Sequence, residues 1–247
     1  MPTQRHLLLV ATEERDPACV PFDPMLVSGL LARGHEVLVA PVASLVWDSR
    51  QSLPSVRAVR LGAAETSAVG DVMLTALDAL HFRRAEGADA RPLLAAAHLL
   101  APLAERTAFF NNPAALADWS WHDVDPGHGP VHHSVFVLGR TLHHWWQSVD
   151  HDLDFFSGET SGVAETRPYE PWDEEVRAAE RVAEELARSG LVVARLDWAA
   201  GRLCAVDVGD PRLPPLTPHH GVLSQRMALW YELACRRRGL RLIEREG

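Results

Sequence analysis

The chain has 247 residues, which is enough for one domain or for one domain with a small second lobe. Its composition, 47% hydrophobic and 23% charged with a mean hydropathy of −0.08, excludes a disordered or collagen-like chain. No apolar run approaches the roughly 18 residues that a membrane-spanning helix needs, so we expect no membrane insertion. The net charge of −9 argues against a broad attraction to nucleic acid.

The basic residues are all arginine: the lysine and arginine total is 24, and the sequence contains no lysine. This excludes Schiff-base catalysis, a pyridoxal-phosphate anchor and a P-loop lysine, and it indicates the codon bias of a GC-rich bacterium. The three cysteines, Cys19, Cys204 and Cys235, are widely spaced, which is typical of reduced thiols. The apolar run Leu7–Val10 is too short for a signal peptide, so a cytoplasmic location is expected.

The N-terminal half shows the pattern of a parallel α/β lobe. An apolar run, Leu7–Ala11, predicts a buried strand, and apolar residues at helical spacing then lead to Gly34. A second strand over Glu36–Ala40 completes a βαβ unit, which implies a parallel strand pair. The further predicted elements are a strand at Val56–Leu61, helices at Asp71–Arg84 and Arg91–Leu103, and a strand at Thr107–Phe110.

The C-terminal half has a different periodicity. Alternation on both sides of Gly139-Arg140 predicts a β-hairpin, and an apolar stripe ending before Gly190 predicts a helix. The predicted elements are the hairpin Val131–Ser148, a loop Ser157–Pro171, the helix Asp173–Ser189, strands Leu191–Trp198 and Arg202–Val208, a helix His220–Arg238 and a strand Leu240–Glu244. The fold class is therefore mixed α/β, with a parallel lobe over 1–112, a connecting segment over 113–130 and an α+β lobe with an antiparallel sheet over 131–247.

Five segments in this order carry a resemblance to a known family. They read RGHEVLVA, FFNNPAALADWSWHD, SVFVLGRTL, LARSGLVVARLDW and LCAVDVGDP. Together they resemble the ATP-grasp superfamily, and most of all its glutathione-synthetase-like and cyclo-ligase branch. The resemblance implies a pre-ATP-grasp-like N-terminal lobe, a C-terminal lobe with a metal-binding acidic pair, and a setting in natural-product biosynthesis.

The same segments depart from the family pattern at its phosphate-binding positions. Only residues 114–130 separate Pro113 from the hairpin, which leaves no room for the central ATP-binding subdomain that the resemblance implies. The family's cationic positions read Asp123, Ser134 and Phe156 here. We therefore expect a degenerate, shortened relative that binds no ATP.

Histidine is the densest chemical signal. Seven of the 13 histidines lie within one segment: His122, His128, His132, His133, His143, His144 and His151. A two-residue turn at Gly139-Arg140 would pair Val135 with His144 and place His133, His144 and Trp146 on one face of the hairpin.

Two imidazoles on one face could hold a transition metal, with His133, His144 and His151 as ligands, or could serve as general acid and base. The candidate catalytic residues are His132, His133, His143, His144, Asp197 and Asp207. The alternative is a hairpin whose histidines only pack beside tryptophans or face solvent.

Asp197 and Asp207 stand where the resemblance places the metal-binding pair, with Gly209 in place of its asparagine. Substrate contacts are predicted from Glu13 and Asp16, in the loop after the first strand, where parallel sheets commonly bind ligands. Trp145 and Trp146 could line an apolar cavity or cover exposed core.

The leading functional hypothesis is an ATP-independent enzyme that acts on a small molecule through acid/base or metal-assisted rearrangement, cyclisation or hydrolysis. Its cofactor would be a divalent transition metal or none. The first alternative is a non-catalytic module that binds a peptide or a partner protein, and the second is an ATP-dependent carboxylate–amine ligase with an unorthodox site. Neither nucleic acid nor membrane is an expected partner, and the sequence leaves self-association open.

Overall fold

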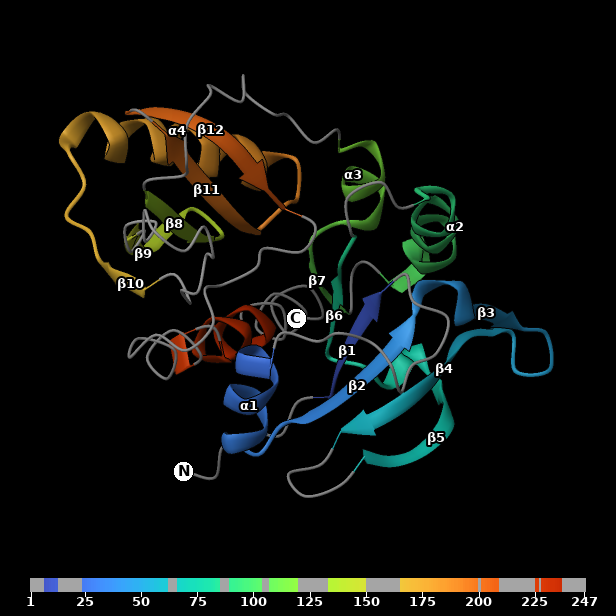
Figure 1. The fold of residues 1–247 in the computed structure, drawn as a ribbon. Coiled ribbons are helices and arrows are strands. Elements are labelled where there is room, and N and C mark those ends of the chain that lie inside the picture. The colour runs from blue at the N-terminus through green and yellow to red at the C-terminus, as the bar shows by residue number, and fades with distance from the viewer. Residues whose placement is uncertain are drawn as a thin grey trace, which may run out of the picture.

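The computed structural model describes residues 7–12, 24–61, 66–84, 89–103, 107–119, 133–149, 165–199, 201–208, 225–226 and 228–236. Two sheets dominate these residues, one built from the N-terminal half of the chain and one from the C-terminal half (Figure 1). The helical residues 228–236 return to the N-terminal lobe and lie beside α1 (Pro24–Ala32).

The first sheet has the strand order β3-β4-β2-β1-β6-β7, and β5 pairs with β4. Its strands are β1 (Leu7–Thr12), β2 (Glu36–Pro41), β3 (Leu45–Asp48), β4 (Leu53–Leu61), β5 (Thr66–Met73), β6 (Ala79–Phe82) and β7 (Ala108–Phe110). The pairs β1–β2, β1–β6 and β6–β7 are parallel, which confirms the predicted βαβ start. The pairs of β4 with β2, β3 and β5 are antiparallel, so this sheet is mixed.

Helices cover both faces of the first sheet. Successive side chains of β2 point to opposite faces, and each face packs against a different helix. Val37 packs in one cluster with Leu30 of α1, whereas Leu38 packs in another with Leu93 of α2 (Arg91–Leu100). A third helix, α3 (Pro113–Asp118), lies against α2, and short 3₁₀ turns occupy Val42–Ser44, Leu74–Ala76 and Ala101–Leu103.

The predicted helix Asp71–Arg84 is wrong. Residues 71–73 finish β5, a 3₁₀ turn follows, and Ala79–Phe82 form the central strand β6. All four residues of β6 are buried, and a strand buried on both faces shows no alternation that would distinguish it from a buried helix.

The second sheet is antiparallel throughout, in the order β10-β9-β8-β11-β12. Its strands are β8 (His133–Leu138), β9 (Thr141–Val149), β10 (Glu165–Pro168), β11 (Val193–Ala199) and β12 (Arg202–Asp207). The hairpin and the later strand pair therefore share one sheet, as predicted. The short strand β10 lies in a segment that was expected to be a loop.

Helix α4 (Asp173–Arg188) packs on one face of this sheet, where its buried Ala179, Ala183 and Leu186 meet Val135 and Leu196. The opposite face carries Phe136 and Val193 toward α1 and the helical residues 228–236. Mixed α/β architecture with a parallel start and an antiparallel C-terminal sheet is thus confirmed. The boundaries at 112 and 131 stay a prediction, because residues 120–132 lie outside the described part of the chain.

Candidate functional site

The hairpin β8–β9 contains a bulge that decides which of its side chains share a face. Phe136 pairs with His144 and Val137 pairs with Leu142, which leaves His143 as the extra residue. The bulge moves the register by one residue from the predicted Val135–His144 pairing, so that Val135 faces Trp145 instead. Since the side-chain period of a strand is two, His133 and His144 lie on opposite faces, and the prediction that they share one is wrong.

His133 lies on the α4 face of the sheet and is 5% exposed. Its ring stacks against Tyr169, at 4.1 Å between centroids and 17° between planes, and against Trp198 at 5.7 Å and 12°. Its Nε2 atom lies 2.9 Å from Oε1 of Glu175. Trp145 also belongs to this cluster, and its ring centroid lies 5.0 Å from that of Trp198.

Glu175 organises this cluster from the first turn of α4. Its Oε2 accepts hydrogen bonds from the Tyr169 hydroxyl and from the backbone N–H of Trp172, both at 3.0 Å. Desolvation, followed by the hydrogen bond to Glu175, raises the pKa of Tyr169 to about 12, so this hydroxyl stays a donor at neutral pH. Sequence reasoning missed Tyr169 and Glu175, because only the fold brings them to β8.

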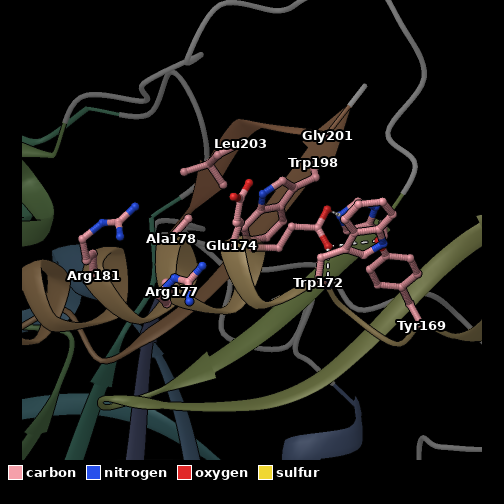
Figure 2. A pocket seen from close by; sticks show the side chains of 11 residues that line it. Tyr169, Trp172, Glu174, Arg177, Ala178, Arg181, Trp198, Gly201 and Leu203 are labelled. Carbon is pink, nitrogen blue, oxygen red and sulfur yellow. Dashed lines mark hydrogen bonds and ion pairs between the residues drawn. The ribbon is translucent and has the colours of Figure 1, made fainter.

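A groove opens beside this cluster, between α4 and the end of the β11–β12 hairpin (Figure 2). Its volume is about 790 Å³, which lies within the range of small-ligand pockets. Tyr169, Trp172 and Trp198 form an aromatic part of its wall, and Arg177 and Arg181 lie farther along α4. Leu203 and Ala178 also line the groove.

The opposite face of the sheet carries the acidic pair. Register places Arg195 opposite Asp207, and Asp197 lies two residues along β11 on the same face. Asp197 is 4% exposed, and its Oδ1 and Oδ2 accept from Nε of Arg195 at 3.0 and 3.1 Å. The register thus places positions 197 and 207 on one face of neighbouring strands, and a shared metal-binding role for them stays a prediction.

The other predicted site residues are scattered. His143 is half-buried at the bulge, and burial, with the charge of Arg226, lowers the pKa of its imidazole. Trp145 belongs to the α4-face cluster, whereas Trp146 is buried on the opposite face. The structure leaves Glu13, Asp16, His132 and His151 outside the residues it describes, and of His144 it describes only the backbone.

The predicted metal set loses the geometry on which it rested, because the strand register places positions 133 and 144 on opposite faces and His151 is not among the described residues. Within the described ranges, no group of three His, Cys, Asp or Glu side chains could hold a metal ion. None of the described helices is long and apolar enough to cross a membrane.

No protein-family profile and no curated protein matches the sequence. Among solved structures, the ATP-grasp ligase PsnB complexed with a minimal precursor matches with 16% identity and a TM-score of 0.51, over 92% of this chain and 99% of that chain. PsnB complexed with minimal precursor, Mg and ADP matches with 15% identity and a TM-score of 0.49, over 90% and 97%. The macrocyclase MdnC bound with precursor peptide MdnA from Microcystis aeruginosa MRC matches with 9% identity and a TM-score of 0.48, over 90% and 99%.

These comparisons overturn two expectations. PsnB, which has the match with a TM-score above 0.5, is an ATP-grasp ligase complexed with a minimal precursor, and this finding contradicts the hypothesis of an ATP-independent small-molecule enzyme and the expectation of no ATP. The partners named for the matched proteins are precursor peptides, where a small molecule was expected. The chain has an ATP-grasp-like fold.

Proposed function

We propose that this protein is an ATP- and magnesium-dependent ligase that joins a carboxylate to an amine on a peptide substrate, in natural-product biosynthesis. The supporting observation is the likeness to the ligase PsnB, which spans 92% of this chain and nearly all of that one. In this proposal the chain belongs to the cyclo-ligase branch and has a shortened connection between Pro113 and the hairpin.

The acidic face of the second sheet is the proposed metal site. Asp197 and Asp207 would supply carboxylate oxygens, the ligands that magnesium prefers, and their positions on neighbouring strands suit a shared ion. The donor chemistry therefore fits magnesium. The ion pair with Arg195 holds the Asp197 carboxylate in place on this face.

Arg195 is the proposed phosphate contact on the same face. Its guanidinium is planar and always charged, and it can donate two parallel hydrogen bonds to a phosphate. Bound Mg-ATP supplies the phosphoryl group that activates a carboxylate, and the overall reaction converts carboxylate, amine and ATP into amide, ADP and phosphate. Asp197 would orient Arg195 for this contact through the bonds that it accepts from Nε.

Thermal unfolding with ADP tests the proposal. ADP with magnesium at about 100 times its dissociation constant should stabilise the wild-type protein by roughly 2.7 kcal/mol, and EDTA should abolish the effect. Asp207→Asn and Asp197→Asn should each remove most of the shift, measured against the nucleotide-free variant so that any loss of stability cancels. Asp71→Asn, an exposed carboxylate on β5, should keep the full shift. A wild-type protein that shows no magnesium-dependent shift would contradict the proposal.

A further inference from the structure

We propose that Asn111 is a positioning residue for the acidic pair: its side-chain amide holds the ends of the two strands that carry Asp197 and Asp207 in the arrangement that a magnesium ion needs. This inference rests on the proposed function, because it concerns how the same site is held in shape. Asn111 directly follows β7, and its side chain is fully buried. It acts on the acidic pair through the backbone of β11 and β12.

The pairing between β11 and β12 ends at the acidic pair. Its last partners are Arg195 and Asp207, and Asp207 is the final residue of β12. Val193, the first residue of β11, lies two residues before Arg195 and pairs with Leu138 of β8. The end of a strand opens more easily than its middle, because its backbone groups have fewer partners. The position of Asp207 is therefore fixed only if another group supports the strands at this end.

The Asn111 amide supplies that support to both strands. Its Oδ1 accepts hydrogen bonds from the backbone N–H groups of Val192 and Val193, at 2.9 and 3.1 Å. Its Nδ2 donates to the carbonyl of Val208, the residue directly after Asp207, at 3.4 Å. One planar amide thus bonds the beginning of β11 and the residue that follows β12. It fixes the two strands relative to one another where their own pairing has ended.

The same amide connects this end of the second sheet to the first sheet. Its Nδ2 also donates to the carbonyl of Phe82, the last residue of β6, at 3.3 Å. The two hydrogen bonds that Oδ1 accepts and the two that Nδ2 donates use the full capacity of an asparagine side chain. Asparagine also tolerates the left-handed φ of 61° at this position better than most residues. Asparagine therefore fits this position through its backbone and through its side chain.

Magnesium binding depends on such support more than the binding of most ions does. Magnesium requires near-ideal octahedral geometry, with oxygen ligands at about 2.0–2.1 Å, so a small displacement of a carboxylate weakens binding. Groups that hold metal ligands in place typically contribute about 10–100-fold to metal affinity. Asp197 is held directly, by the hydrogen bonds that it accepts from Arg195. Asn111 does the corresponding work for position 207, through the backbone.

Isothermal titration calorimetry of Asn111→Gly tests the inference. Glycine adopts a φ of 61° without strain, so this variant removes the amide while the backbone conformation stays allowed. ADP binding is measured at low temperature over a range of Mg²⁺ concentrations. The Mg²⁺ midpoint, at which ADP affinity is half of its maximum, should rise about 10-fold or more, whereas the affinity at saturating Mg²⁺ should change less than about threefold. An unchanged Mg²⁺ midpoint would overturn the inference.

Two control variants separate positioning from a loss of stability. Leu93→Ala removes a fully buried side chain of α2, and Asn112→Ala removes the exposed neighbour that caps α3. Each should leave the Mg²⁺ midpoint within about twofold of the wild-type value, because unfolded molecules reduce the number of binding sites and do not alter the folded ones. If these controls move the midpoint as far as Asn111→Gly does, Asn111 has only a structural role and the inference fails.

A measurement on the wild-type protein does not depend on the folding of any variant. Asn111 and Asn112 are the only asparagines in the sequence, so ¹⁵N-asparagine labelling gives two side-chain amide signals in NMR spectra, one buried and one exposed. Because coupling between two sites is reciprocal, magnesium bound at the acidic pair must affect the Asn111 amide. Adding Mg²⁺ to the protein with ADP should shift the Asn111 signal and leave the Asn112 signal in place. An Asn111 signal that stays in place while Mg-ADP binds would overturn the inference.

Failure of this inference can be distinguished from failure of the proposed function. A wild-type protein without magnesium-dependent ADP binding would remove the ligase proposal and, with it, the site that Asn111 positions. A wild-type protein that binds Mg-ADP, with a Mg²⁺ midpoint that Asn111→Gly leaves unchanged, would keep the ligase proposal and remove only the role of Asn111.

Discussion

The side-chain oxygen of Asn111 accepts a hydrogen bond from the backbone N–H of Val193 at 3.1 Å and so joins the end of β7 to the start of β11. The same oxygen accepts from Val192 at 2.9 Å, while Nδ2 donates to the carbonyls of Phe82 and Val208. The fully buried side-chain amide of Asn111 therefore forms hydrogen bonds with segments of both sheets. Asn111 also has a φ of 61°, a left-handed conformation that asparagine tolerates better than most residues.

Asn111→Ala should destabilise the protein strongly. It would leave four backbone groups without this partner, three of them in buried bonds, at about 1–3 kcal/mol for each buried group that stays unsatisfied, and alanine would be strained at this φ. We expect a loss of at least about 3 kcal/mol in the free energy of unfolding, measured by urea denaturation.

The neighbouring Asn112→Ala is the matched control. Asn112 is exposed and caps α3 by accepting from the N–H of Ala114, so its replacement should cost only about 1 kcal/mol. Similar losses for the two variants would contradict the role of Asn111 as the link between the sheets.

Periodicity predicted much of the fold, and its failures have physical causes. The helix α4 was readable because it has one buried and one exposed face, and the hairpin was located by its turn at Gly139-Arg140, although all six residues of β8 are buried. The strand β6 was not, since burial on both faces removes the alternation. The antiparallel pairings of β4 depend on long-range contacts that periodicity does not encode.

The candidate sites depended on details finer than periodicity. A single extra residue, His143, shifts the strand register so that positions 133 and 144 fall on opposite faces of the sheet. No residue of the turn indicates in the sequence that such a bulge will form. The acidic pair rests on matching segments of a known family rather than on periodicity, and its role stays a prediction. The groove could not, because Tyr169, Glu175 and Trp198 come from three elements that only the fold brings together.

Glu232 should make stability depend on pH in the acidic range. Its carboxylate accepts from Nε and Nη2 of Arg33, both at 2.7 Å, and lies 2.7 Å from Nε2 of His35. Chiefly through the bond to Arg33, the pKa of this carboxyl falls to about 2. Because the folded pKa is below the unfolded one, the unfolded state binds the proton more readily. The stability that Glu232 contributes is complete above about pH 4.5 and is lost as the pH falls toward 2.

Glu232→Gln should therefore cost about 3 kcal/mol at neutral pH, where it breaks a buried ion pair, and progressively less below pH 4.5. Urea denaturation across pH 3–7 measures the difference between the wild type and the variant. Glu184→Gln, which removes an exposed pair with Arg188, should cost less than about 1 kcal/mol at any pH. A Glu232→Gln difference that stays constant with pH would show that Glu232 titrates normally.

His81 should add a second pH dependence closer to neutrality. It is 5% exposed in β6, and Tyr231 contacts its Nδ1 through the phenolic hydroxyl. Burial, with a smaller effect of Arg83, lowers the pKa of this imidazole to about 3. The unfolded state therefore takes up a proton at higher pH than the folded state does, and stability should fall as the pH decreases from about 6.5 to 3.

Replacing both partners, as His81→Phe with Tyr231→Phe, should flatten that part of the stability profile. Apolar rings of similar shape keep the packing, so the cost at pH 7 should be small compared with either single change. His98→Gln, on the exposed side of α2, should leave the profile as in the wild type. A double variant that retains the full slope between pH 6.5 and 4.5 would assign the dependence to other groups.

Gly190 should be the least replaceable of the glycines that end helices or turns in the described residues. It ends α4 with a φ of 80°, and a Cβ there would lie 3.0 Å from Cβ of Asn112. Gly201 has a similar φ of 75° but open space around it, so it measures the conformational cost alone. Gly201→Ala should cost about 1–2 kcal/mol, and Gly190→Ala about 1–3 kcal/mol more, because the backbone bond from Asn112 N–H to the Gly190 carbonyl resists separation of the two segments. Urea denaturation of both variants checks the difference.

Asn112→Gly removes the opposing Cβ and should recover part of the loss in Gly190→Ala, which makes the two changes non-additive. Strict additivity, or equal costs at Gly190 and Gly201, would mean that the contact with Asn112 does not constrain this turn.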